Sequence, residues 1–185
     1  MYGEGIFIGY RHYDRTHIPP LFPFGHGLSY TQFEYGRPSV TPKILREGGS
    51  LEVIVAVTNI GDRGGMETVQ FYVSRREEKG RKKNKVVRPE KELVSFEKVE
   101  LEPDETKHIR VILDKYAVGY WDVGENRWVA EQGKWEVLVA ASAEDVRYVL
   151  PFLRFVRFHT DDSVNTTNTR YSAVFEIKES FSWVF

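Results

Sequence analysis

Residues 51–59, Leu-Glu-Val-Ile-Val-Ala-Val-Thr-Asn, decide the fold class. This stretch is rich in β-branched residues, and alternate positions are all apolar: Leu51, Val53, Val55 and Val57. Successive side chains of a strand point to opposite faces, so the pattern predicts a β-strand with one fully buried face. Ile54 and Ala56 make the second face apolar as well, which predicts a central strand.

Stretches of the same kind follow at short intervals, with turns rich in Gly, Pro, Asn and Asp between them. They are residues 67–74, 93–101, 107–113, 120–122, 127–129, 134–141 and 146–158. Many short strands with little helical periodicity predict an all-β protein, a two-layer antiparallel β-sandwich.

Three details of this sandwich are also predicted. In residues 67–74, Val69, Phe71 and Val73 are expected to face the core, with Gln70 and Tyr72 among the outward positions. Residues 93–101 and 107–113 flank a turn containing Pro103 and are expected to form a hairpin.

Composition sets limits on function. The chain has 185 residues, a net charge of -1 and no cysteine. The charge gives no overall attraction to nucleic acid or anionic membranes, and disulfides and thiolate chemistry are excluded. No apolar run is long enough to predict a transmembrane helix. The first residues lack a signal-peptide pattern, which leaves the localisation open between secreted and cytoplasmic.

The N-terminal residues predict an extended arm. Residues 2–14 are β-branched and aromatic between glycines, which predicts one strand that pairs with a sheet outside the sandwich. A metal or acid/base site among Arg11, His12, Tyr13, Asp14 and His17 is disfavoured, because strand alternation would divide these side chains between two faces.

The arm continues through Pro19 and Pro20 into a junction, Leu21-Phe-Pro-Phe-Gly-His-Gly-Leu-Ser-Tyr-Thr-Gln-Phe33. Small residues bend the backbone here, while the aromatic rings bury area on both sides of the bend. His26 lies between two glycines with no nucleophile or acid nearby, so we expect it to stabilise the bend by backbone hydrogen bonds rather than to act in catalysis.

The junction resembles the boundary motif of glycoside hydrolase family 3, the β-glucosidases and their relatives. Three further segments are similar to that family in order and spacing, at residues 57–73, 88–101 and 133–137. One departure lies at Asp104, where the family usually has Gly in a turn that Asp tolerates.

The resemblance implies a division of the chain. Residues 1–35 would be the end of an upstream catalytic α/β domain and the junction, and residues 36–158 a fibronectin type III-like (immunoglobulin-like) domain. Residues 159–185 would be a tail with an extra strand over residues 171–184. Phe22, Phe24 and Tyr30 would pack between domains, and in isolation the arm would be loosely attached.

The resemblance also implies a function: a C-terminal accessory and stabilising domain of a β-glucosidase-type enzyme, whose parent hydrolyses terminal β-D-glucosyl residues. The family's nucleophile and acid/base residue lie upstream, so this chain is expected to have no catalytic residue, no cofactor and no metal. Its partners would be the upstream catalytic domains, with the β-glucoside bound only through the parent, and neither nucleic acid nor membrane. A homo-oligomer stays open.

The alternative function is a free-standing carbohydrate-binding or adhesion sandwich. Trp121 and Trp128 flank a turn and are the candidates for stacking on a sugar, which requires two exposed and coplanar rings. Asn165 begins an N-glycosylation pattern. The basic segment 75–91 is expected to be a solvated loop rather than a polyanion site, because no aromatic residues are interleaved in it.

Overall fold

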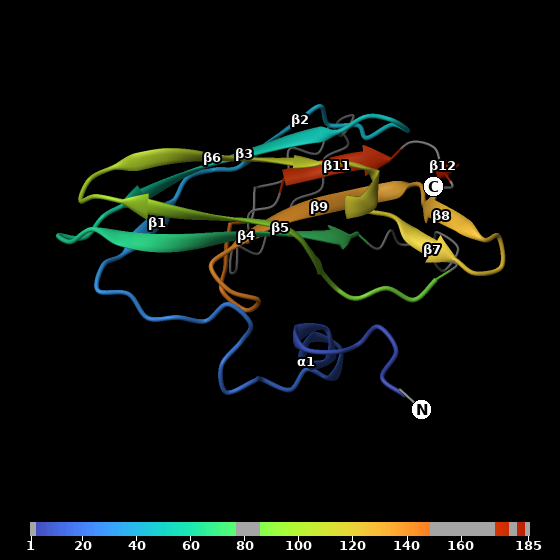
Figure 1. Cartoon of the computed structure of the whole chain (residues 1–185), viewed down its shortest axis with the longest axis horizontal. Coiled ribbons are helices and arrows are strands. Elements are labelled where there is room, and N and C mark those ends of the chain that lie inside the picture. Colours follow the sequence, from blue (N-terminus) through green and yellow to red (C-terminus); the bar gives the residue numbers. More distant parts are fainter. Residues whose placement is uncertain (1–2, 77–85, 149–172, 178–180, 184–185) are drawn as a thin grey trace, which may run out of the picture.

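The computed structural model describes residues 3–76, 86–148, 173–177 and 181–183. Two antiparallel sheets are packed against each other, and the short helix α1 (Tyr10–Thr16) lies outside them (Figure 1). The fold is the predicted β-sandwich.

The first layer, the β3 sheet, is organised around β3 (Leu51–Asn59). β6 (Thr106–Leu113) pairs along one edge of β3, from Leu51 opposite Leu113 to Thr58 opposite Thr106. The short strands β1 (Phe33–Tyr35) and β2 (Ser39–Thr41) share its other edge. The prediction that residues 51–59 form a central strand is confirmed.

The second layer, the β4 sheet, has the order β10-β9-β4-β5. Its strands are β4 (Gly65–Arg75), β5 (Glu92–Leu101), β9 (Gly133–Ala140) and β10 (Val146–Tyr148), and β11 (Ala173–Ile177) also pairs with β9. A small third sheet contains β7 (Tyr120–Asp122), β8 (Arg127–Ala130) and β12 (Phe181–Trp183), and the 3-10 turn η1 (Lys115–Ala117) precedes it.

The core lies between the two main layers. Alternate residues of β3 are at most 1% exposed, as are Val69, Phe71 and Val73 of β4. Trp135, Val137 and Val139 of β9 complete this contact and are equally buried. The inward faces expected from alternation are therefore confirmed.

The predicted hairpin of residues 93–101 and 107–113 is wrong. β5 pairs with β4, whereas β6 pairs with β3 in the other layer. The turn between them crosses from one sheet to the other, with Asp104 in the left-handed region at φ 61. Leu101 and Ile109 are both buried in the common core, and alternation alone does not distinguish this crossing from a hairpin.

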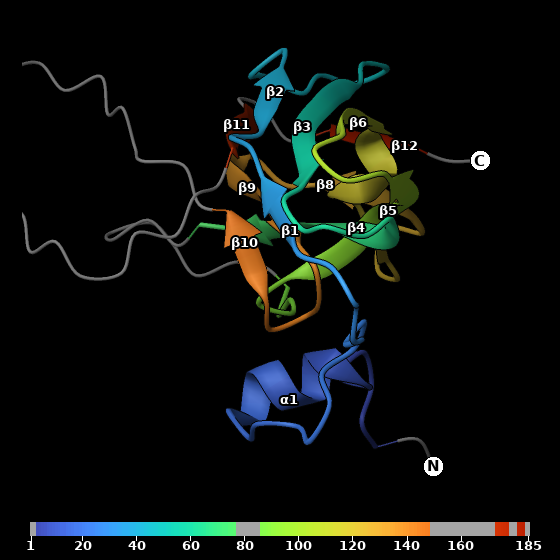
Figure 2. The same cartoon turned by 90° about the vertical axis from the view of Figure 1, so that its left-hand side faces the viewer.

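The predicted strand over residues 2–14 is also wrong, since Tyr10–Thr16 form helix α1. Gly9 precedes it with φ 57, and His17 ends it in the left-handed conformation. Isolated helices this short are marginal in water. Contacts with the β4 sheet therefore stabilise it, and Figure 2 shows α1 beside that layer. The arm is docked, contrary to the loose attachment we expected.

Docking of the arm explains a further difference. Gln70 and Tyr72 alternate with the core residues of β4, yet they are 3% and 0% exposed. The arm covers the outer face of the sheet at these positions. In the tail, two strands, β11 and β12, replace the single strand expected over residues 171–184, and residues 149–158 of the predicted strand lie outside the described residues.

Candidate functional site

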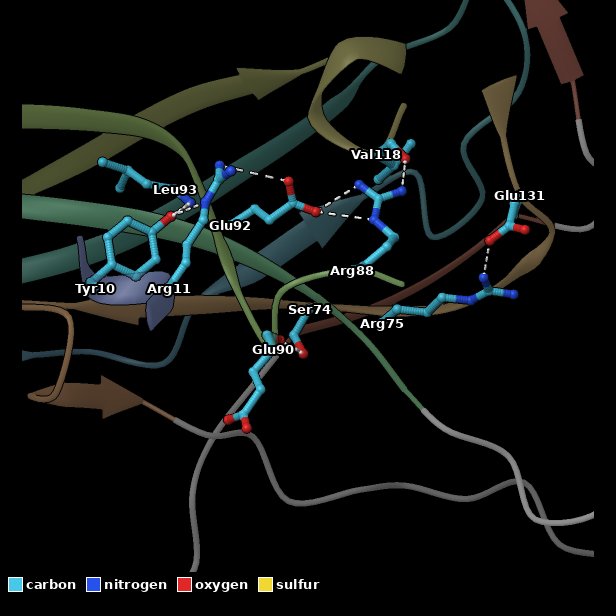
Figure 3. A network of polar contacts seen from close by, with 10 residues as sticks. All are labelled: Tyr10, Arg11, Ser74, Arg75, Arg88, Glu90, Glu92, Leu93, Val118 and Glu131. Carbon is cyan, nitrogen blue, oxygen red and sulfur yellow. Dashed lines mark hydrogen bonds and ion pairs between the residues drawn. The ribbon is translucent and has the colours of Figure 1, made fainter. Parts of the chain in front are cut away.

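The first component of the candidate site is the contact between α1 and the start of β5. The Tyr10 hydroxyl accepts a hydrogen bond from the backbone N–H of Leu93 at 2.8 Å (Figure 3). The Tyr10 ring meets Tyr72 edge to face, with centroids 5.6 Å apart, and lies 6.0 Å from the ring of Phe24. Tyr10 thus joins the arm, the junction and the outer face of the β4 sheet.

Charged side chains flank this aromatic contact. Asp14 forms an ion pair with Lys91, and both side chains are nearly buried. Arg11 lies 3.7 Å from Glu92. Tyr10 and Asp14 are four residues apart and therefore share one face of the helix. We call the set Tyr10, Arg11, Asp14, Lys91, Glu92 and Leu93 the arm clamp.

Arg88 extends the arm clamp to the far end of the sandwich. Its guanidinium donates to Glu92 Oε1 at 3.0 and 2.7 Å and to the Val118 carbonyl at 2.6 Å (Figure 3). It also lies over the Trp135 ring, 4.8 Å from the centroid. Arg88 is therefore a structural residue, and so are Arg75, which pairs with Glu131, and Lys91. These three side chains are not solvated as we expected, and residues 77–85 of the basic segment lie outside the described residues.

The second component fixes the junction to the β3 sheet. The side chain of Asn59 is fully buried and makes four hydrogen bonds. Its amide donates to the carbonyls of Arg63 and Leu101, and its oxygen accepts from the Gly61 N–H and the Thr31 hydroxyl. A Cβ on Gly61 would lie 2.2 Å from the Thr31 hydroxyl oxygen, so glycine is required for this close approach.

A second close approach fixes the junction to β4. Gly25 has φ 84, and a Cβ there would lie 1.9 Å from the amide nitrogen of Gln70. Gln70 is itself held, because it donates to the Ala141 carbonyl and accepts from the Tyr72 hydroxyl at 2.6 Å. The backbone N–H of His26 donates to the Pro23 carbonyl, as expected for a residue that stabilises the bend, and its ring stacks on Phe22.

Although its backbone is fixed, the junction exposes large apolar side chains. Leu28 is 95% exposed, Tyr30 91% and Leu21 88%. We call the exposed set the apolar strip; its members are Ile18, Leu21, Phe22, Phe24, Leu28 and Tyr30. Exposed apolar surface of this extent is typical of an interaction site.

Burial affects two tyrosines in and near these contacts. Tyr35 donates to Glu67 Oε1 at 3.0 Å, and burial, followed by the charge of Glu67, raises the pKa of Tyr35. Burial also raises the pKa of Tyr72, with Tyr10 and Asp14 adding to the effect. Both phenols are therefore held in the neutral form.

The two tryptophans that are candidates for sugar binding, Trp121 and Trp128, do not form the flat stacking surface that a sugar ring requires. The rings of Trp121 and Trp128 are 6.1 Å apart with their planes at 76°, edge to face. Trp121 is 39% exposed, whereas Trp128 packs partly against the core and meets Tyr116 edge to face. The two rings are not coplanar, and sugar binding by them stays a prediction.

Several carboxylates line a cavity of about 530 Å³ between α1 and the β4 sheet. Asp14, Glu90, Glu136 and Glu144 line it, together with Lys91. Within the described ranges, no three His, Asp or Glu side chains are placed to hold a metal ion, and no helix is long and apolar enough to span a membrane. Asn165 lies outside the described residues.

The arm clamp is not among the sites predicted from the sequence, although its residues lie in two segments with recognisable patterns. Lys91, Glu92 and Leu93 belong to a segment singled out by resemblance, and Tyr10 and Asp14 to the arm. Helical spacing of Tyr10 and Asp14 was the available signal, and the β-branched and aromatic content of residues 2–14 concealed it.

The sequence and structure are similar to those of known proteins. Residues 67–143 match the model of the fibronectin type III-like domain. The chain is 40% identical over 151 residues to β-glucosidase BoGH3A of Bacteroides ovatus, covering 82% of this chain and 19% of that protein. It is 46% identical over 145 residues to thermostable β-glucosidase B of Acetivibrio thermocellus, covering 78% of this chain and 18% of that protein.

Solved structures give the same result. The β-glucosidase of Kluyveromyces marxianus matches 98% of this chain with a TM-score of 0.76 and 33% identity, over 18% of that enzyme. β-Glucosidase 3B of Thermotoga neapolitana, solved in complex with glucose, matches 98% with a TM-score of 0.75 and 28% identity. The chain spans about a fifth of the length of these proteins.

Proposed function

Since the chain carries a fibronectin type III-like domain and is a relative of one part of the family 3 β-glucosidases, we propose that it is the C-terminal accessory portion of such an enzyme. In this role the sandwich supports upstream catalytic domains and contributes no catalytic group. The parent would hydrolyse terminal β-D-glucosyl residues. We further propose that the chain has three parts. Residues 1–35 form the arm and the junction, residues 36–158 the sandwich domain, and residues 159–185 the tail.

The observation that carries this proposal is the extent of the match. It includes the arm and the junction as well as the sandwich, since the Kluyveromyces marxianus enzyme is matched over 98% of this chain. The same match covers only 18% of that enzyme. A segment that adds arm, junction and sandwich to a much longer β-glucosidase fits an accessory portion better than a free-standing module.

The roles of the carboxylates support the same proposal. A retaining glycosidase needs two carboxyl groups about 5–5.5 Å apart on either side of the scissile bond. Asp14 and Glu92 are instead paired with Lys91, Arg11 and Arg88 in the arm clamp and its extension. These two carboxylates therefore stabilise the docked arm through ion pairs.

The test compares the purified chain with the full-length gene product in hydrolysis of an aryl β-glucoside. The chain is expected to match buffer, and the full-length protein to hydrolyse the substrate. Glu90→Gln and Glu136→Gln in the chain serve as controls, because these residues line a cavity together with the carboxylates of Asp14 and Glu144. Activity of the chain that either substitution abolishes would contradict the proposal.

A further inference from the structure

We propose that β10, β11 and β12 are pieces of one edge strand, and that residues 149–171 are an insertion into this strand that the sandwich does not require. The edge formed by β9 and β8 is then a strand-binding surface, and the tail occupies it through β11 and β12. This inference is independent of the proposed function, because it concerns pairing within the chain.

The pairing register shows that β10 and β11 continue each other. Both pair antiparallel with the edge of β9 that β4 leaves open, where Tyr148 is opposite Val139 and Ala173 is opposite Val137. A continuous strand needs a single residue between Tyr148 and Ala173, opposite Leu138, because the two strands of an antiparallel pair advance together. The sequence has 24 residues there, so 23 are in excess.

The same run continues onto the third sheet. β11 ends with Ile177 opposite Gly133, and β12 begins with Phe181 opposite Ala130. Three residues separate β11 from β12, and two residues separate β8 from β9, so both runs keep in step to within one residue. Figure 1 shows β11 beside β9 and β12 beside β8. The tail therefore pairs along one edge that two sheets share.

The residue types along this edge favour the observed register. Glu176 is opposite Lys134, which brings opposite charges to one cross-strand position. Trp183 is opposite Trp128, so an aromatic residue pairs with an aromatic residue. Pairs of both kinds stabilise antiparallel strands. An unfilled edge would instead leave a row of backbone N–H and C=O groups available to other chains.

An insertion at this place costs the sandwich little. The chain leaves the edge after Tyr148 and returns to it at Ala173, and the residues on both sides keep their partners on β9. The entropic cost of closing a loop rises only slowly with its length. The edge strand can therefore contain a long insertion without a change of fold.

Three variants test whether residues 149–171 are required. Deletion of residues 149–171 leaves Ser172 as the single residue between Tyr148 and Ala173, the number that the register needs. Deletion of residues 149–172 is the matched control, because it removes one residue more and puts the two parts of the strand out of register. A third variant replaces residues 149–171 by a segment of Gly and Ser of the same length.

The chain has no cysteine, so engineered disulfides can report the pairing of β11 with β9. Lys134→Cys combined with Glu176→Cys places two thiols at opposite positions of these strands. The Cα atoms of such a pair are about 4.5–5.5 Å apart, within the range that a disulfide spans. Lys134→Cys combined with Phe175→Cys is the control, because these positions are one residue out of register.

The deletion of residues 149–171 and the Gly/Ser variant are expected to melt no more than about 4 °C below the unchanged chain. The control deletion should melt at least about 4 °C below the first deletion. The Lys134→Cys and Glu176→Cys pair should form a disulfide under mild oxidation in the unchanged chain and in the first deletion, whereas the control pair should not.

Three results would each overturn the inference. A first deletion that melts more than about 4 °C below the unchanged chain, or does not fold, would show that the removed residues contribute to the fold. Equal melting temperatures of the two deletions would show that the register does not depend on the number of residues removed. Absence of the disulfide in the unchanged chain would contradict the pairing of β11 with β9. None of these measurements depends on glucoside hydrolysis, so the proposed function stands or fails separately.

Discussion

Replacing Asn59 by Ala tests whether one buried side chain holds the junction on the sandwich. Asn59 ends β3 and is fully buried. Its side chain connects the Thr31 hydroxyl, the Gly61 N–H and the carbonyls of Arg63 and Leu101, at distances between 2.5 and 3.0 Å. The Ala variant removes all four hydrogen bonds together.

The expected magnitude comes from the bonds lost. A hydrogen bond within a protein contributes about 0.5–1.5 kcal/mol net, and a buried group left without a partner costs about 1–3 kcal/mol. Four bonds, of which those to Leu101 and Thr31 are buried, predict that Asn59→Ala lowers the free energy of unfolding by about 3–5 kcal/mol. Thr31→Val removes only one of the four, so it should cost about 1 kcal/mol.

The assay is urea denaturation followed by tryptophan fluorescence, with the slope m compared between variants. An unchanged m value would show that the folded and unfolded states keep their compactness. A loss below about 1 kcal/mol for Asn59→Ala would refute the reasoning, because that value corresponds to a single bond. A loss for Thr31→Val equal to that for Asn59→Ala would also refute it.

Three further predictions concern the turn, the buried phenols and the arm clamp. Asp104 has φ 61, so Asp104→Ala should lower the free energy of unfolding by about 1 kcal/mol, whereas Asp104→Gly should leave it unchanged or raise it by about 0.5 kcal/mol, as measured by thermal denaturation. Burial raises the pKa of Tyr35 and of Tyr72 above the ordinary value of 10.0, so their contribution to stability is present below that pH and is lost as the pH rises above it. Urea midpoints between about pH 9 and 12 should therefore fall, and less steeply in Tyr72→Phe. Lys91→Met leaves Asp14 without its ion-pair partner, so amide exchange of α1 should accelerate at least about tenfold while β3 keeps its protection, and adding Asp14→Asn should restore part of the protection.

The strands of the sandwich could be predicted because their inward faces carry a local signal. In β3 and in the Val69, Phe71 and Val73 positions of β4, a period of two in apolar residues coincides with burial. That signal depends only on neighbours along the same strand. The apolar period does not show which strand pairs with which. For this reason it predicts that β5 and β6 pair with each other, whereas β5 pairs with β4 and β6 pairs with β3.

The candidate site could not be predicted in the same way, because it depends on contacts between distant segments. In a two-layer sandwich each sheet has one buried face and one face exposed to solvent. Gln70 and Tyr72 lie on the face of the β4 sheet that would then be exposed. They are buried only because residues more than 40 positions earlier, in α1 and the junction, lie over them. No local pattern in β4 reports this second layer.

Two glycines, Gly25 and Gly61, allow the junction and the sandwich to fit closely against each other. Gly25 in the junction leaves room for Gln70 of β4, and Gly61 in the sandwich leaves room for Thr31 of the junction. Each of the two parts therefore lacks a side chain where the other inserts one. A pair of complementary gaps of this kind fixes the position of the junction along both sheets, because a shift in either direction would bring a backbone against a filled site. Leu28 and Tyr30, the two members of the apolar strip that lie between Gly25 and Thr31, are consequently presented at one defined place on the sandwich.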